Sequence, residues 1–261
     1  MKKHILKKLS IFSFQLSILA LLLSSCEPAP WTNGKAVTET RWFDEPISAI
    51  HVYHDIDVTL IEADTFRIEI TTGENLMEKI TSNVEDGVLY LKNENIRNWI
   101  RSYDYPLDIK VYHNGITRIN YESWGDLVSE GYISQDTIDH FDLDVKHGSG
   151  HIGIHINCKT LNIISRDGTA KIVVSGSSDY TDIYHNARND IQTIGLESKD
   201  ASAKVYYEGS IIVNCTNKLD ALIDNFGSIY YNSNVRELND SITYSPVPNS
   251  RGVIEPYDFF N

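Results

Sequence analysis

The sequence is short of basic residues and lacks the motifs of several common enzyme classes. Lys and Arg number 23 against 36 Asp and Glu in 261 residues, so no basic patch for nucleic acid or anionic lipid is expected. No Gly-x-Ser-x-Gly motif, phosphate-binding loop or dinucleotide fingerprint is present. The excess of acid is compatible with cations, neutral glycans or a basic partner, and equally with a solvated surface. No cofactor and no nucleic-acid partner are predicted.

Long apolar runs are also scarce, and the one that stands out lies at the N-terminus. Four lysines among the first eight residues precede an apolar stretch over 9–23, and Ser24 and Ser25 then precede Cys26. This order is typical of a secretory signal peptide. The stretch is too short and too polar for a spanning helix, which needs ~20 apolar residues. Small residues before a cysteine resemble the lipobox of bacterial lipoproteins, and this resemblance implies cleavage before Cys26 and diacylglycerol on its thiol.

Processing at Cys26 changes both the charge and the expected location. Removing four lysines and no acid takes the formal charge from −13 to −17. Acylation at Cys26, with palmitate among the added chains, predicts a protein anchored in the cell envelope at the outer membrane, on either its periplasmic or its outer face. The residues up to 37 contain two prolines close to the anchor and are predicted to form a flexible tether.

The remaining cysteines, Cys158 and Cys215, both lie inside apolar, strand-like runs. An exported compartment permits a disulfide bond between them. Cysteine is among the residue types most often buried, so buried free thiols are predicted, with pairing as the alternative.

From about residue 38 apolar and polar residues alternate, which predicts β-strands. The alternation is clear over 50–60, 66–70, 88–91 and 109–111. Asp86-Gly87 is a hairpin-turn signal, because glycine adopts positive φ without steric cost. Only 74–80 and 95–101 show a helical pattern, and both segments are short.

The second half of the chain contains an internal repeat of about twenty residues. Each repeat has an apolar core centred on an isoleucine, and a turn precedes each core. The isoleucines are Ile152, Ile172, Ile191, Ile211 and Ile229, and the turns lie at 148–150, 167–169, 188–190, 208–210 and 226–228. A second apolar cluster recurs at Phe141/Leu143, Leu161/Ile163, Ile183 and Leu219/Leu222. The pattern predicts stacked coils that bury their inward faces against one another, and the Ile, Val and Tyr content favours a β-solenoid. An antiparallel sandwich is the alternative.

The predicted organisation has five parts. A signal peptide (1–25) and a tether (26–37) precede an N-terminal β lobe (38–118). Solenoid repeats of the same domain (119–237) follow, and the chain ends in a loose polar tail (238–261).

The order of these elements is similar to that of a known family. Arg41-Trp42-Phe43 precedes the strand-like segment 47–52, and 57–60, 84–91, 109–112 and 116–119 follow before glycine-containing turns. This order resembles the head GIN domain family, described as putative auto-transporter adhesins and common among lipoproteins of Bacteroidetes-type bacteria. The resemblance covers roughly 38–236 and implies a right-handed β-helix-like fold and export, with no catalytic residues to carry over. The turn at 188–190 departs from the pattern because it contains no glycine, so an irregular third rung is expected.

Three histidines lie close together in the sequence, at His147, His151 and His155. Strand residues i and i+4 lie ~13 Å apart at about 3.3 Å per residue. Because zinc–nitrogen distances are about 2.0 Å, two such histidines cannot share one metal ion, and solvated side chains are predicted. Asp167, Asp190 and Asp224 lie near the rung turns, where aspartate favours local backbone bonding. Calcium at these turns is the alternative.

A carboxylate pair is the second group with the residue types for chemistry. Asp142 and Asp144 share a strand face about 6.6 Å apart, a spacing compatible with an inverting glycosidase pair. Lys146 follows on the same face, and alternating charge of this kind is ordinary for an exposed strand.

The sequence therefore predicts a non-enzymatic, adhesin-like domain, lipid-anchored through Cys26, whose solenoid face binds a glycan or a protein. Scattered tyrosines are compatible with such binding, but no residue of the ligand site is identified. The alternatives are a carbohydrate-active lyase or hydrolase that uses Asp142 and Asp144, and a purely structural envelope protein.

Overall fold

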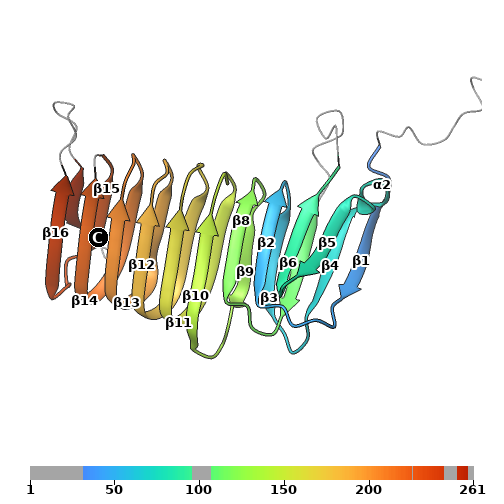
Figure 1. Cartoon of the computed structure of the whole chain (residues 1–261), viewed down its shortest axis with the longest axis horizontal. Coiled ribbons are helices and arrows are strands. Elements are labelled where there is room, and N and C mark those ends of the chain that lie inside the picture. Colours follow the sequence, from blue (N-terminus) through green and yellow to red (C-terminus); the bar gives the residue numbers. More distant parts are fainter. Residues whose placement is uncertain (1–31, 96–106, 225, 244–251, 258–261) are drawn as a thin grey trace, which may run out of the picture.

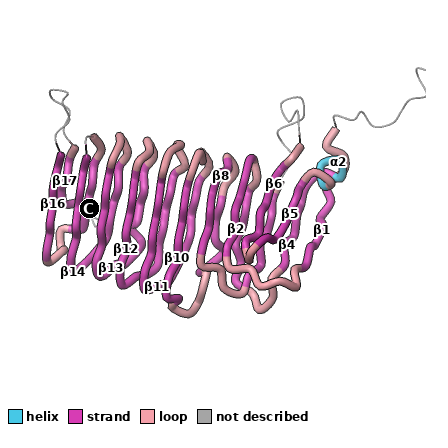
Figure 2. Tube along the Cα trace, viewed as in Figure 1, coloured by secondary structure: helices cyan, strands magenta, loops and turns pink. Residues whose placement is uncertain are grey.

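The computed structural model describes residues 32–95, 107–224, 226–243 and 252–257 of this chain (Figure 1). Strands account for almost all of the regular structure in these residues (Figure 2), so the all-β prediction is confirmed. The predicted signal peptide, Cys26 and the helical pattern beyond residue 95 lie outside the described residues. Within them, no helix is long and apolar enough to cross a membrane.

The described chain contains seventeen strands in one continuous sheet, and one short helix. The elements of the first half are β1 (Ala36–Trp42), β2 (Ala49–His54), β3 (Asp57–Glu62), β4 (Arg67–Gly73), α2 (Glu74–Met77), β5 (Ile80–Glu85), β6 (Val88–Asn93), β7 (Asp108–His113), β8 (Arg118–Ser123) and β9 (Leu127–Tyr132). Those of the second half are β10 (Ile138–Val145), β11 (His151–Ser165), β12 (Lys171–His185), β13 (Asp190–Val205), β14 (Ser210–Asp224), β15 (Ser228–Asn232), β16 (Glu237–Thr243) and β17 (Val253–Tyr257).

The strands follow two ladders that enclose one core. Ladder A runs β5, β6, β2, β8 and β10, continues through the C-terminal halves of β11 to β14, and ends at β16. Ladder B runs β1, β4, β7, β3 and β9, continues through the N-terminal halves of β11 to β14, and ends at β15 and β17. Each long strand therefore belongs to both ladders, and the inward side chains of both ladders form a single apolar cluster.

The predicted isoleucine column is confirmed and is longer than the repeat. Strands β11 to β14 pair in parallel, so equivalent residues of successive rungs lie side by side. In register along ladder B the column reads Ile70, Ile109, Val58, Leu127, Ile152, Ile172, Ile191, Ile211, Ile229 and Ile254. All of these except Ile254 are buried. Each inner residue of the column lies between two neighbours, so the column forms a continuous apolar contact between rungs.

The second predicted cluster is confirmed except at its last member. The buried members along ladder A include Leu143, Ile163, Ile183, Ala203 and Ala221, which pair in register. Leu222 pairs with Lys204 and faces outward, so its assignment to the core is wrong. Successive strand residues point to opposite sides, and Ala221 occupies the inward position in β14.

The third rung is irregular, as the turn without glycine predicts. The register of β12 against β13 shifts between Val173 and Gly176. In the preceding turn Asn189 is buried, and its Nδ2 donates to the carbonyl oxygen of Ala170 at 2.6 Å while its Oδ1 accepts from Ser165 Oγ at 3.0 Å. A side-chain amide thus ties this turn to the rung before it.

The N-terminal part of the stack does not follow the order of the sequence. Strand β2 pairs in parallel with both β6 and β8, and β3 pairs in parallel with both β7 and β9. Strands β2 and β3 therefore lie between strands that come later in the chain. Antiparallel pairs close this end of the stack. The predicted hairpin turn at Asp86-Gly87 joins β5 to β6, and it has positive φ at Asp86 as well as at the glycine.

Two segments predicted to be loose are held to the sheet. In the tether, Lys35 accepts a backbone hydrogen bond from Glu74, and β1 begins at Ala36. In the tail, β16 pairs with β14, and β17 pairs with β15. The backbone N–H and C=O groups at the edges of β14 and β15 need partners, and β16 and β17 provide them even though their sequences are polar. Leu238 and Ile254 also pack against the core.

Cys158 and Cys215 are free and buried, as predicted. They belong to one inward column, separated by Ser178 and Ser198 on the two rungs between them. Three steps of ~4.8 Å place their Cα atoms ~14 Å apart, whereas a disulfide requires less than about 7 Å. Burial raises the pKa of each thiol to about 12, so both remain protonated and inert at neutral pH.

Among the described residues, His113 in β7 is fully buried and neither ring nitrogen has a hydrogen-bond partner. Burial lowers its pKa to about 4. Below pH 6.5 the unfolded chain binds a proton here that the folded chain does not. The stability present above pH 6.5 therefore declines as the pH falls toward 4, by about 3 kcal/mol for this group.

We expect His113→Leu to remove most of this decline. The free energy of unfolding, measured by urea denaturation at several pH values between 7 and 4.5, should fall less steeply in the variant. Burial also lowers the pKa of His185, which stays in place, so a smaller slope persists. Identical slopes in the two proteins would show that His113 does not contribute.

Candidate binding face

The outward side of ladder A, from β6 to β16, is the candidate site and is called the polar face below. Its strands pair in parallel and in register over most of their length, so outward side chains of successive rungs form columns ~4.8 Å apart. One column reads Arg118, Asp142, Asn162, Asp182, Ser202, Asp220 and Asn239. Because acids, bases and amides are neighbours, they bind one another from rung to rung.

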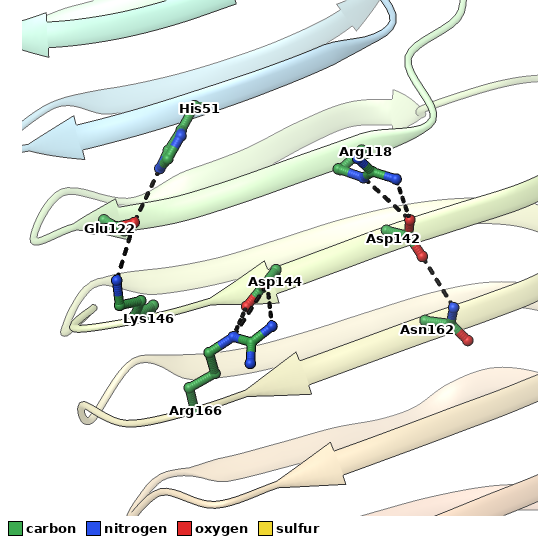
Figure 3. Close-up of polar contacts among 8 residues, drawn as sticks. All are labelled: His51, Arg118, Glu122, Asp142, Asp144, Lys146, Asn162 and Arg166. Atoms are coloured by element: carbon green, nitrogen blue, oxygen red, sulfur yellow. Dashed lines mark hydrogen bonds and ion pairs between the residues drawn. The ribbon is translucent and has the colours of Figure 1, made fainter. Parts of the chain in front are cut away.

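Asp142 and Asp144 both lie on the polar face, and each is bound by a different arginine (Figure 3). Asp142 accepts from Arg118 Nη2 at 3.1 Å and from Asn162 Nδ2 at 3.0 Å. Asp144 accepts from Arg166 through both oxygens, at 2.9 and 2.8 Å. Both carboxylates are thus engaged by side chains of neighbouring strands, whereas the two members of a glycosidase pair face one substrate together. This arrangement favours a link between rungs over an acid–base pair.

A second cluster on the same face joins His51 of β2 to Glu122 of β8 (Figure 3). His51 Nε2 lies 3.2 Å from Glu122 Oε1, and Lys146 Nζ lies 3.9 Å from the same oxygen. The Tyr53 hydroxyl lies 3.0 Å from His51 Nδ1, and the two rings stack with centroids 3.9 Å apart. Lys92 lies over the Tyr53 ring at 4.9 Å. The cluster presents a compact aromatic and charged surface.

Tyr53, His51 and Glu122 have the order of a proton relay, but their titration does not suit a nucleophile. Burial, with Glu122 nearby, raises the pKa of Tyr53 above its ordinary value. Burial lowers the pKa of His51, although Glu122 opposes this effect. A nucleophilic tyrosine requires a lowered pKa. The chemistry that this cluster supports is binding, through its stacked rings and hydrogen-bonding groups.

The sequence contains no signal for this cluster. His51 and Glu122 are 71 residues apart. They become neighbours only because β2 pairs with β8, which follows much later in the chain, as well as with β6. Periodicity identifies the strands but not an insertion of this kind.

The polar face continues toward the C-terminal end of the stack. Lys204 Nζ binds Asp182 at 3.1 Å, and Asn239 Nδ2 binds Asp220 at 2.9 Å. A shallow hollow of 330 Å³ lies between β13, β14 and β16, and Leu222 lines it with these polar neighbours. The face therefore offers hydrogen-bonding groups over many rungs.

The predicted histidines do not converge. His147 and His155 are exposed, in agreement with the solvated assignment, whereas His151 is partly buried; His147 Nδ1 binds Asp167 at 2.7 Å. Asp190 accepts from Ser210, and Asp224 is exposed. Over the described ranges the structure brings together no group of three or more His, Cys, Asp or Glu side chains that could hold a metal ion.

Comparison with known proteins gives one family and several solved structures. The profile of the family described as "Putative auto-transporter adhesin, head GIN domain" matches residues 47–234. A putative adhesin from Bacteroides fragilis has a TM-score of 0.74 at 20% identity, and the match covers 87% of this chain and 99% of that one. The comparison with curated proteins finds no match.

Two further structures are similar over 87% of this chain and 98% of their own. A putative lipid binding protein from Parabacteroides distasonis has a TM-score of 0.63 at 18% identity. A putative adhesin from Parabacteroides merdae has a TM-score of 0.58 at 16% identity. At these identities the likeness shows a common fold alone.

Proposed function

Because the chain belongs to the head GIN domain family of putative auto-transporter adhesins, we propose that it is a lipid-anchored adhesin of the bacterial cell envelope. In this proposal the domain is non-enzymatic and presents its polar face to a glycan or protein partner. The lipid on Cys26 holds it at the outer membrane. The family membership agrees with the resemblance drawn from the sequence.

The observation that carries the proposal is the construction of the polar face. Its side chains are held by their neighbours on adjacent rungs, so little conformational entropy remains to be lost when a partner binds. The columns repeat every ~4.8 Å along the stack, and an extended partner could contact several rungs at once. Arg118 and Arg166 are half-exposed although each binds a carboxylate, so their remaining donors face solvent.

The proposal extends to the form of the stack. We infer that the coils make a right-handed β-helix-like solenoid, as the family resemblance implies. The parallel pairing of β11 to β14 and the in-register isoleucine column support this inference. Stacked coils of this kind present long faces well suited to binding.

The test of the proposal is a binding experiment with the full-length protein in mild detergent. Arrays of glycans and of envelope proteins are probed with the wild type, Arg166→Ala and Lys171→Ala. Arg166 directly follows β11 and binds Asp144 of the polar face, whereas Lys171 begins the ladder B part of β12, so the two variants remove the same charge from different places. The proposal is supported by saturable binding whose affinity falls about fivefold, equivalent to about 1 kcal/mol, in Arg166→Ala but not in Lys171→Ala.

A reducing-sugar release assay on the same glycans examines the enzymatic alternative. Release that disappears in Asp142→Asn or Asp144→Asn would replace the binding function with a lyase or hydrolase. No binding on the arrays together with no release of sugar would favour a purely structural envelope protein.

The lipid anchor gives a separate prediction. Cells labelled with a palmitate analogue should incorporate it into this protein, and Cys26→Ala should abolish the label and release the protein from the membrane fraction. Cys158→Ala is the matched control, because that thiol is buried and should leave the label unchanged. Persistent labelling of Cys26→Ala would contradict the anchor.

A further inference from the structure

Three outward side chains form a row across ladder B at the N-terminal end of the stack. Trp42 of β1 pairs in register with Arg67 of β4, and Arg67 pairs with Tyr112 of β7. The Arg67 guanidinium lies 3.6 Å from the Tyr112 ring centroid and 5.6 Å from that of Trp42. Glu69 accepts from the Tyr112 hydroxyl at 3.1 Å. Cation–π contacts thus hold the row together.

Trp42 is nevertheless 65% exposed, the largest value among the large hydrophobic side chains that the structure describes. Among the described residues its strand pairs only with β4, so no described strand covers its other side. Tryptophan is usually highly buried, and exposed aromatic rings are enriched where proteins bind partners. The indole is therefore placed to receive a ligand.

Two hollows adjoin Trp42, and both are also lined by Phe43, Asp44 and Glu45. One hollow, of 530 Å³, extends to residues 82–84 of β5. The other, of 460 Å³, is further lined by Pro46, Ile47, Asp64, Thr65, Phe66 and Asn114. We call the two hollows together the Trp42 cleft.

The polar side chains of the Trp42 cleft differ from those of the polar face in having no partner. In the described structure, no hydrogen bond or ion pair engages the side chains of Asp44, Glu45, Asp64, Asn83 or Asn114. On the polar face, by contrast, neighbouring rungs bind most acids. The cleft combines an open indole with free carboxylates and amides, which is the set of groups that recognises a sugar.

We propose that the Trp42 cleft binds a neutral pyranose unit of a glycan. The apolar C–H face of the sugar stacks on Trp42, and its hydroxyls donate to Asp44, Glu45 and Asp64 and bond to Asn114. Three exposed carboxylates around the cleft disfavour sialic or uronic acids, because like charges repel. The cleft rests on the proposed adhesin function but lies outside the polar face, and residues 42–45 precede the segment that matches the family profile.

The position of the cleft fits a ligand in front of the anchored protein. Ala36 and Trp42 lie at opposite ends of β1, about 20 Å apart at ~3.3 Å per residue, and residues 32–35 lead into the Ala36 end (Figure 1). The cleft therefore opens at the edge of the stack away from that entry.

The experiment measures saccharide binding to the full-length protein in mild detergent by titration calorimetry. The probes are neutral oligosaccharides of hexoses, N-acetylhexosamines and deoxyhexoses, together with sialylated and uronic-acid oligosaccharides. We expect saturable binding of at least one neutral probe, with a loss of about tenfold or more in Trp42→Ala and a smaller loss in Asp64→Asn. Trp124→Ala is the matched control, because Trp124 is 60% exposed but lines neither hollow.

Unchanged melting temperature in Trp42→Ala, expected for so exposed a side chain, shows that lost binding does not reflect unfolding. Three results would each overturn the proposal that the Trp42 cleft binds a neutral sugar. These are equal saccharide affinity in Trp42→Ala and wild type, a preference for acidic probes, and no saccharide binding. Binding of a protein partner through Arg166 with no saccharide binding would overturn the cleft alone and leave the adhesin function standing. Loss of all binding in both experiments would remove both proposals.

Discussion

Replacing Ile172 with aspartate is expected to destabilise the domain by about 4 kcal/mol or more, a large part of the stability of an ordinary domain. Ile172 is fully buried and lies between Ile152 and Ile191 in the column of ladder B. An aspartate there is either charged without a partner or protonated against its normal pKa. Apolar neighbours on both rungs offer it no hydrogen bond, so the cost falls on the folded state.

The adjacent residue provides the control. Val173 points to the outside of β12 and is only partly buried, so Val173→Asp places the same charge one residue away on the solvent side. We expect a change below about 1 kcal/mol for this variant, because surface substitutions rarely cost more. Urea denaturation of both variants measures the difference. Similar stabilities would show that the isoleucine column does not hold the rungs together.

Replacing Gly176 with alanine is expected to cost about 3 kcal/mol, from strained backbone and a steric clash together. Gly176 has φ +118°, a conformation that side chains with a Cβ rarely adopt. A Cβ there would also lie against the carbonyl oxygen of Ile156 on the previous rung, well inside van der Waals contact. The neighbouring strand must therefore move, which disturbs the pairing of β11 with β12.

Two other glycines separate the two causes. Gly131 has φ +80° with open space around the Cβ position, so Gly131→Ala introduces strain alone and should cost about 1 kcal/mol. Gly153 has no positive φ, and its closest neighbour would be the His151 side chain at 3.1 Å, so Gly153→Ala should change stability little. Thermal unfolding of the three variants should rank them Gly176, Gly131, Gly153. If Gly176→Ala were not the least stable of the three, the pairing of β11 with β12 would tolerate the movement that the added Cβ requires.

The repeat half of the fold could be predicted because its chemistry is periodic. Ile152, Ile172 and Ile191 recur at nearly constant spacing, and in a parallel stack constant spacing becomes lateral contact. Leu222 shows the limit of this reasoning. Ala221 and Leu222 are both apolar, and only the register of β14 decides that the smaller residue faces inward.

The N-terminal half could not be ordered in the same way. Alternation locates β2, β3, β6 and β7, but each of these strands has a suitable apolar side for several neighbours. The insertion of β2 between β6 and β8 depends on the whole set of pairings, since every strand must find two partners except at the ends. The His51–Glu122 cluster is a consequence of that global choice.

The Trp42 cleft shows the same division. Trp42, Asp64 and Asn114 lie far apart along the chain, and nothing in their spacing relates them. The antiparallel pairing of β1 with β4 and of β4 with β7 brings their surroundings together at one edge.

By itself, the sequence determined the all-β class and the inward isoleucines, and it favoured parallel rungs and buried free thiols over an antiparallel sandwich and a disulfide bond. These follow from local alternation and a fixed repeat, which act between residues near in sequence or equivalent in position. Only the tertiary structure decided the order of the N-terminal strands, the pairing of Asp142 and Asp144 with separate arginines, and the ends of the sheet. Those features depend on which strands become neighbours. Backbone hydrogen bonds between strands form with almost any side chains, so local sequence does not specify which side chains will meet at a site.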